Sequence, residues 1–372
     1  SHARESSMTD ILSLQRKENH VIAITGNLGK SEVARLLGDG LSQDNLCYFS
    51  DNKKILPVRK NSQATISIHV VDFQADASSA ALECDVCVMT SVTNSFESCA
   101  NIFTGMKAGA VAIIAEAHDN SAKLAQQATL KGLRVIHVGL SSDIRARSDK
   151  DVWVERIVQQ SDCSCVVAHI LGGRLTYKIS LPGDQAVINS LLALAAIKIV
   201  GGDMALAAIS FASQKAKAGY GQEIKLGDKS NSLTLLDYSK GMNVLSLCAA
   251  IAHMSLVQAG KYNHRIVVLS DFDETIAMDK THLEDLHKHL MLSGITRVLT
   301  TGSVIAKLTR SAGILSEEFA SNKALVNRLQ SMAKVNDVVV VMGTKSSGMA
   351  EIADRLKASY EMSDDSLRIA AE

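Results

Sequence analysis

Short apolar runs alternate with segments of helical spacing along most of the chain. The run 21–25, Val-Ile-Ala-Ile-Thr, is rich in β-branched residues and predicts a buried strand. The segment 32–37 that follows it has the spacing of a helix. Alternation of this kind with short connections predicts a mostly parallel sheet covered on both faces. Further strands are predicted in this half at 45–50, 65–72, 85–90, 110–115 and 134–138, with helices at 120–132 and at a segment ending near 107–109.

A different pattern begins after residue 151. Runs at 152–159, 165–170 and 175–181 predict a small antiparallel addition, with Gly172 and Gly173 in a turn. Helices are then predicted over 185–200 and over 204–214, the second one capped by Asp203. The remainder predicts a second open, doubly wound sheet, with strands at 233–237, 265–269, 297–300 and 337–341 and helices at 243–258, 280–293, 322–333 and 347–357.

Composition narrows the class of protein. The 372 residues, 47% of them hydrophobic, suit two domains with sizeable cores. Lys+Arg 39 balances Asp+Glu 39, so no net field attracts nucleic acid or an anionic membrane. No apolar run reaches the roughly 18 residues of a membrane span, and no signal peptide is recognisable. We therefore expect a cytoplasmic protein with neither a nucleic-acid nor a membrane partner.

The cysteines favour the same compartment. Seven is an odd number, and most of them lie in apolar strands, which argues against a disulfide framework. Cys84 and Cys87 have the spacing of a metal or redox pair, but the segment around them reads as a strand. Structural thiols in a reducing compartment are the preferred interpretation.

The turn after the first strand is the main candidate for chemistry. Residues 25–31 read Thr-Gly-Asn-Leu-Gly-Lys-Ser, a glycine turn that leads from a strand into a helix. Backbone N–H groups and a helix N-terminus attract phosphate, Lys30 adds a positive charge, and the Ser31 hydroxyl can bind Mg²⁺. A tight turn without a ligand is the competing interpretation. The predicted nucleotide-binding residues here are Thr25, Gly26, Asn27, Gly29, Lys30 and Ser31.

This turn departs from a strict Walker A sequence, since Ile24 stands where a glycine would be needed, and it resembles the variant found in Mur ligases. Two later segments resemble motifs of the family and follow the turn in the same order as in the family. They are V-L-S-D-F-D-E at 268–274 and V-M-G-T-K-S at 341–346. The chain is thus identified as a member of this family of ATP-dependent amide-forming enzymes over roughly 18–357. It is most similar to the branch that adds D-alanyl-D-alanine to UDP-muramoyl tripeptide.

The resemblance implies an α/β protein of two domains. A central ATP-binding domain with a P-loop-type cradle is expected at 18–218, and a smaller Rossmann-like domain at 219–360. A disordered leader at 1–17 and a tail at 361–372 would flank them. Leu-Pro-Gly at 181–183, followed by Asn189, matches a segment whose last Asn holds the nucleotide base, and Gly-Tyr-Gly at 219–221 takes the place of the hinge.

The resemblance also implies a magnesium site, with departures. The metal-binding Glu of the family is matched by Asp72, although a solvent-facing carboxylate at a strand end is the alternative. Thr93 and Asn94 begin a segment whose metal-binding His is missing here. Cys99 stands at the position of a carbamylated Lys, so two of three metal supports are absent.

The function implied is ATP-dependent ligation of a carboxylate to an amine through an acyl phosphate. Lys30, Asp72 and Lys240 are the expected catalytic residues, although Lys240 also reads as a solvated turn residue. Asp237 and Asp271 are expected to bind the nucleotide from the closing domain. ATP and Mg²⁺ are the expected cofactors.

The substrates are expected to differ from those of the family. The cradle begins close to the start of the sequence, which argues against a UDP-sugar domain and for a small or carrier-presented acid and amine. A degenerate ligase acting as a binding or scaffold subunit is the alternative. A homo-oligomer and a hetero-oligomer both remain open.

Overall fold

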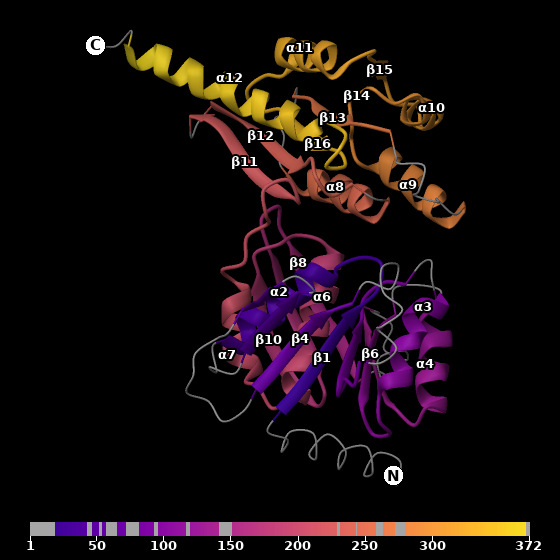
Figure 1. Ribbon diagram of the computed structural model, residues 1–372. Coiled ribbons are helices and arrows are strands. Elements are labelled where there is room, and N and C mark those ends of the chain that lie inside the picture. The colour runs from indigo at the N-terminus through magenta and orange to yellow at the C-terminus, as the bar shows by residue number, and fades with distance from the viewer. Residues whose placement is uncertain are drawn as a thin grey trace. The chain divides into compact units, whose positions relative to one another are not determined.

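The computed structural model consists of two compact units (Figure 1). The first comprises the described residues up to Gln159 together with Cys163–Gln214, and the second comprises Gln160–Asp162 and the described residues from Lys215 onward. The structure describes residues 19–42, 47–51, 54–56, 65–71, 82–92, 96–116, 120–140, 151–228, 231–242, 244–257, 263–271 and 280–369.

A ten-stranded sheet organises the first unit, in the order β10-β9-β8-β7-β6-β5-β1-β4-β2-β3. The central strand β1 pairs in parallel with β4 on one side and β5 on the other, so the chain crosses over between neighbours as a doubly wound sheet requires. The strands are β1 (Asn19–Thr25), β2 (Cys47–Asp51), β3 (Lys54–Leu56), β4 (Thr65–Val70), β5 (Val86–Met89), β6 (Val111–Ala115), β7 (Arg134–Gly139), β8 (Val152–Gln159), β9 (Ser164–Ile170) and β10 (Gly173–Ile179).

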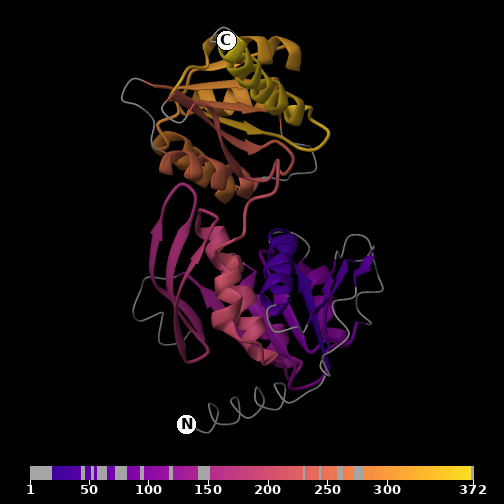
Figure 2. The same ribbon diagram turned by 90° about the vertical axis from the view of Figure 1, so that its left-hand side faces the viewer.

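The antiparallel strands β8, β9 and β10 continue this sheet. Strand β8 pairs in parallel with β7 and antiparallel with β9, and β10 pairs antiparallel with β9 (Figure 2). They are the small antiparallel addition that the sequence predicted, and they extend the main sheet. The short strand β3, which the sequence did not predict, pairs antiparallel with β2.

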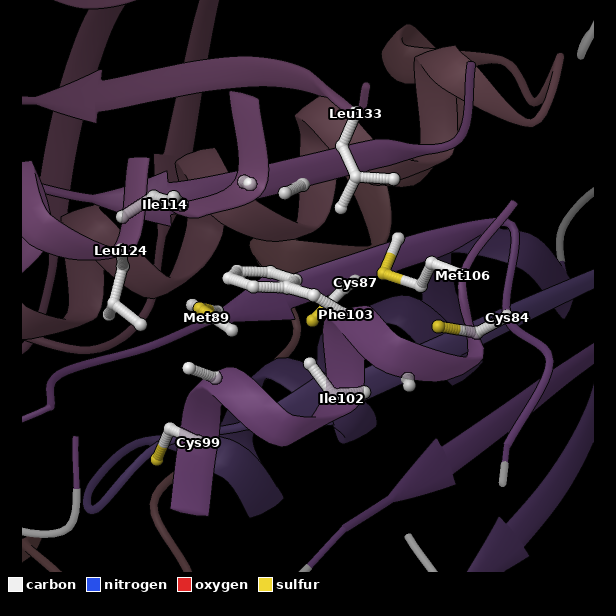
Figure 3. Packing of buried hydrophobic residues seen from close by; sticks show 14 of the residues in the cluster. Cys84, Cys87, Met89, Cys99, Ile102, Phe103, Met106, Ile114, Leu124 and Leu133 are labelled. Carbon is white, nitrogen blue, oxygen red and sulfur yellow. The ribbon is translucent and has the colours of Figure 1, made fainter. Parts of the chain in front are cut away.

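Helices cover both faces of the sheet. On one face α3 (Phe96–Ala100), the 3-10 helix η2 (Asn101–Gly105) and α4 (Ser121–Leu130) enclose an apolar cluster centred on Phe103 (Figure 3). Alternate residues of β5 and β6, among them Met89 and Ile114, point into this cluster, as strand geometry dictates. The other helices of the unit, α2 (Lys30–Ser42), α6 (Asp184–Ile199) and α7 (Met204–Phe211), pack together.

A close contact fixes α2 against its neighbours. A Cβ atom at Gly40 would lie 2.8 Å from Ile197 Cδ1 and 3.0 Å from Ala207 Cβ. Only glycine lets α2 approach α6 and α7 this closely. Helix α7 itself begins at Asp203, whose carboxylate accepts hydrogen bonds from the backbone N–H groups of Ala205 and Leu206, as predicted.

The second unit is a six-stranded sheet in the order β11-β12-β16-β13-β14-β15. It is parallel except for β11, which pairs antiparallel with β12 at the edge. Helices α8, α9 and α10 enclose a core on one face, and α11 and α12 enclose another on the opposite face. The elements are β11 (Gln222–Asp228), β12 (Asn231–Tyr238), α8 (Val244–Leu256), β13 (Arg265–Leu269), α9 (Lys280–Leu292), β14 (Arg297–Thr300), α10 (Ser303–Ser311), β15 (Ser316–Glu318), α11 (Asn322–Met332), β16 (Val338–Met342) and α12 (Met349–Ile369).

The predicted fold class, α/β with large and mostly parallel sheets, is confirmed. The sequence missed three elements of the second unit, namely β11, α10 and β15. Across the residues that the structure describes, no helix is both long enough and apolar enough to cross a membrane.

Candidate functional site

The glycine turn lies at the carboxyl end of β1 and leads directly into α2. Gly26 has φ +128° and Gly29 has φ +86°, conformations that L side chains rarely adopt. The Asn27 N–H donates to the Ser91 carbonyl at 2.6 Å, and Leu28 forms a bridge with Ser91. The end of β5 thus holds the turn in place beside the neighbouring strand.

Close packing requires glycine at both positions. A Cβ at Gly26 would lie 2.2 Å from Thr90 Oγ1, and one at Gly29 would lie 2.7 Å from Asn189 Oδ1. The turn is therefore clamped between the β5 end on one side and α6 on the other. This packing fixes the backbone path of the turn.

Positive charge collects at this end of α2. The Lys30 ammonium donates a hydrogen bond of 2.5 Å to the Gly26 carbonyl, so its Nζ atom lies over the turn. Ser31, in the first turn of this 13-residue helix, is exposed. The helix dipole adds partial positive charge at the same place. The sequence predicted that the glycine turn, Lys30 and the N-terminus of this helix lie together, and the structure places them side by side.

Two buried hydroxyl oxygens beside the turn, Thr25 Oγ1 and Ser91 Oγ, lack a hydrogen-bond partner among the described residues. Burial raises the pKa of Glu32, an effect that the positive charge of Arg35 and the amide of Asn189 partly offset. Buried polar groups nearly always have a hydrogen-bond partner. Unpaired polar atoms beside the turn are therefore able to bind a further polar group.

Asn189 lies beneath the turn in this structure. Its side chain is fully buried on α6, and its Oδ1 accepts a hydrogen bond of 3.0 Å from Gln185 Nε2. It packs against Gly29, a contact that supports the cradle. The base-binding role that the sequence suggested for it stays a prediction.

The expected magnesium supports are sparse. Asp72, Thr93 and Asn94 lie outside the described residues. Cys99 is buried on α3 among apolar side chains, so no charged group occupies that position (Figure 3). Within the described ranges no cluster of three or more His, Cys, Asp or Glu side chains could hold a metal. Of the predicted metal residues, Ser31 lies within the described ranges, and its role toward a metal stays a prediction.

In the second unit Asp237 is occupied by protein partners. The residue is 3% exposed, and its Oδ1 accepts from Ser239 Oγ at 2.6 Å and from Ser239 N at 3.2 Å. Oδ2 accepts from Lys357 Nζ on α12 at 3.0 Å. Burial lowers the pKa of Lys357, but the hydrogen bond and charge of Asp237, helped by Asp354, outweigh burial and raise it. This buried ion pair anchors α12 to β12.

Asp271 has a similar structural partner. Its Oδ1 accepts from Ile305 N at 3.1 Å, and Oδ2 lies 3.5 Å from Val304 N, so the carboxylate caps the N-terminus of α10. Lys240 is exposed, and its stem packs against Gly219 of the expected hinge. Among the described residues its ammonium makes no hydrogen bond or ion pair. Within the described ranges, Lys240 is the one of the three predicted groups of this unit whose charge has no protein partner.

The anchoring partners were missed from the sequence. Lys357, Thr90 and Ser91 are distant in the chain from the groups they hold. A sequence signal exists for Ser91 alone, because it follows a strand that a doubly wound sheet places beside β1.

Comparisons with known proteins show similarity in fold. Residues 88–197 match the family model described as Mur ligase middle domain. MurF from Acinetobacter baumannii has a similar structure, with a TM-score of 0.73 and 16% identity over 95% of this chain and 80% of that one. MurF ligase from Thermotoga maritima, solved in complex with ADP, has a TM-score of 0.71 and 14% sequence identity. The match covers 97% of this chain and 85% of that one. No curated protein sequence matches the chain.

A further similar structure is the UDP-N-acetylmuramate-alanine ligase MurC from Thermotoga maritima, with a TM-score of 0.63 and 13% identity over 96% of this chain and 79% of that one. The fold is therefore that of a Mur ligase. The family model covers residues 88–197 of the 372, so this part of the chain is similar to a Mur ligase middle domain.

Proposed function

We propose that the protein is an ATP-dependent ligase that joins a carboxylate to an amine through an acyl phosphate. The observation that carries this proposal is the cradle, a glycine turn at the N-terminus of α2 with the Lys30 ammonium over it and unpartnered polar atoms around it. The family match and the similarity to an ADP-bound MurF agree with it. A cytoplasmic location is part of the same proposal.

The cradle residues would divide the work of phosphoryl transfer. Backbone N–H groups of the turn from Leu28 to Lys30 would hold the phosphates, because the Asn27 N–H is engaged with Ser91. The Thr25 hydroxyl, which has no partner among the described residues, lies beside the turn. Lys30 would exchange the Gly26 carbonyl for a phosphate oxygen and stabilise the charge that moves during transfer. Lys240, which the sequence predicts as catalytic, is proposed to contribute positive charge to a phosphate of the nucleotide.

The residues present fit a magnesium ion carried in by the nucleotide. Mg²⁺ commonly uses one or two protein oxygens and takes its other ligands from phosphates and water. The exposed Ser31 hydroxyl offers one such oxygen, and Asp72 is proposed as the second. When bound, the ion would neutralise negative charge on the transferred group.

The proposed acid is a small or carrier-presented carboxylate rather than UDP-muramoyl peptide. A hydroxamate assay decides this directly, because hydroxylamine traps an acyl phosphate without the natural amine. The acids tested would be the N-acetylated protein amino acids and UDP-N-acetylmuramoyl tripeptide. Hydroxamate from the tripeptide alone would refute the proposal about the acid.

Calorimetry with ATP tests the cradle itself. Wild type should bind ATP more tightly with Mg²⁺ than without it, and Lys30→Ala should weaken binding by at least about tenfold, because it removes the charge that faces the phosphates. The matched control is Lys131→Ala, an exposed lysine at the end of α4. Equal affinities for wild type and Lys30→Ala would remove the cradle from the mechanism.

A second candidate is a degenerate ligase that serves as a binding or scaffold subunit. Its specific support is that Asp237 and Asp271 are engaged with protein groups and that Cys99 is buried in an apolar cluster. This candidate predicts no ATP binding and no hydroxamate from any acid tested. Metal-dependent ATP binding with turnover would exclude it.

A further inference from the structure

A hydrogen bond between two amide side chains lies beneath the glycine turn, at the start of α6. Gln185 Nε2 donates to Asn189 Oδ1 at 3.0 Å. The two residues are four positions apart, so they lie on the same face of the helix. Asn189 is fully buried, whereas Gln185 is half-buried. Gln185 can therefore act on the cradle through Asn189.

The surroundings of Asn189 fix which end of its amide faces which neighbour. Its oxygen accepts from Gln185, so its NH2 group points away from Gln185. Glu32 on α2 gives an independent indication. Burial raises the pKa of Glu32, and the charge of Arg35 and the amide of Asn189 oppose that effect. Only the N–H side of an amide stabilises a carboxylate, so both neighbours require the same orientation of Asn189.

The same amide lies against the backbone of the turn. A Cβ atom at Gly29 would lie 2.7 Å from Asn189 Oδ1 and 3.2 Å from Asn189 Nδ2. The oxygen is the nearer atom and carries no hydrogen, so it can approach the glycine more closely than an NH2 group could. An amide turned end for end would place its hydrogens there and displace the backbone. The orientation of Asn189 therefore sets the path of the turn at Gly29.

The turn is held at both of its ends, so a displacement in its middle has to be absorbed there. At the end of β5 the Ser91 carbonyl accepts from the Asn27 N–H at 2.6 Å. On α2 the Val33 N–H donates to the Gly29 carbonyl at 2.9 Å. A shift of Gly29 would therefore move residues 28–30, whose N–H groups are proposed to hold the phosphates.

We propose that Gln185 is a positioning residue of the cradle, which holds the Asn189 amide in one orientation and thereby sets the turn for a phosphate group. This inference rests on the proposed nucleotide-binding function and names a residue to which that function had given no role. A site that is already in place binds its ligand more tightly, because no ordering is needed at binding. Without Gln185 the buried oxygen of Asn189 would lose its donor, and the amide could turn.

The variant Gln185→Met tests the proposal, because methionine has a similar length and no N–H group to donate. Calorimetry with ATP and Mg²⁺ should show binding weakened about tenfold. Gln214→Met is the matched control. Gln214 Nε2 donates to Asp39 near the other end of α2, so this variant also removes a glutamine hydrogen bond to that helix. Its affinity for ATP should stay within about twofold of wild type.

Hydrogen exchange followed by mass spectrometry reports on the turn without any nucleotide. The peptide that spans residues 25–31 should exchange faster in Gln185→Met than in wild type, because the Asn27 amide is protected by its bond to the end of β5. Gln214→Met should leave the exchange of this peptide unchanged. If Gln185 served stability alone, the two variants would alter the exchange of this peptide to the same extent.

A double-mutant cycle tests whether Gln185 acts through Asn189. Asn189→Ala removes the amide that lies against Gly29 and should itself speed the exchange of the 25–31 peptide. Adding Gln185→Met to Asn189→Ala should change that exchange by less than about twofold, because no amide remains to be oriented. Additive effects of the two substitutions would show that Gln185 acts by another route and would overturn the proposal.

The outcomes separate this inference from the proposed function. Absence of ATP binding by wild type refutes nucleotide binding, and the exchange measurements then still decide whether Gln185 positions the turn. ATP binding of equal affinity by wild type and Gln185→Met refutes the role of Gln185 and leaves the cradle intact. Equal weakening by Gln185→Met and Gln214→Met would mean that α2 is destabilised as a whole, which also contradicts the inference.

Discussion

Lys357→Met should destabilise the second unit while leaving the first unit unchanged. The substitution keeps most of the apolar stem and removes the ammonium that pairs with Asp237. The two side chains are 23% and 4% exposed, so the pair is largely buried. Removing one partner of a fully buried pair costs about 3–5 kcal/mol. Partial exposure of Lys357 and the two Ser239 hydrogen bonds that remain reduce this to about 2–3 kcal/mol.

Urea unfolding followed by far-UV circular dichroism measures the effect. With a slope of about 1–3 kcal/mol/M, the midpoint of the second unit should fall by about 1 M or more. The single tryptophan, Trp153, lies in β8 of the first unit, so its fluorescence should report an unchanged transition. Lys323→Met, an exposed lysine on α11, is the control and should change the free energy of unfolding by less than about 0.5 kcal/mol.

A double-mutant cycle identifies the cause. Asp237→Asn combined with Lys357→Met should cost less than the sum of the single changes, because no unpaired charge then remains buried. Because the pKa of Lys357 is raised in the folded state, the pair is fully stabilising below about pH 10.4 and loses its effect as the pH rises through the folded pKa. A cost below about 0.5 kcal/mol for Lys357→Met, or strict additivity, would refute this reasoning.

Three further outcomes are expected. Gly29→Ala should weaken ATP binding measured by calorimetry at least about tenfold, because its Cβ would meet Asn189 at 2.7 Å and φ is +86°; unchanged affinity would contradict the clamped turn. Burial, with a smaller effect of Asp85, raises the pKa of Cys84 to about 12. The thiol therefore lowers the free energy of unfolding only above about pH 8.5, progressively toward about 12, and Cys84→Ala should flatten that alkaline dependence. Asp271→Ala should cost about 0.5–2 kcal/mol in urea unfolding through loss of the α10 cap, and an unchanged midpoint would show that α10 needs none.

Local sequence was enough to predict the cradle. A strand, a glycine turn and a helix are consecutive there, so each signal lies within a few residues of the next. Strands β13 and β14 were predicted with their observed bounds, because both are short apolar runs buried on two faces.

The missed elements lack such local signals. Strand β11 is an edge strand with several exposed polar residues, so no apolar run marks it. The residue before α10, Gly302, makes no capping bond, and its cap comes from Asp271, 33 to 34 residues earlier. The pair of Asp237 and Lys357 joins residues 120 apart. Contacts over such distances depend on the packed sheet and cannot be inferred from spacing.

The contact at Gly40 has a consequence for how activity could be tuned in this protein. An α-helix is stiff and rises about 1.5 Å per residue, so Gly40 and Lys30 stand about 15 Å apart on one rigid rod. A single methyl group added at Gly40 would clash with Ile197 and Ala207 and tilt helix α2 as a whole. A substitution at Gly40 can thus change the position of the Lys30 side chain relative to the glycine turn, although the two residues lie about 15 Å apart.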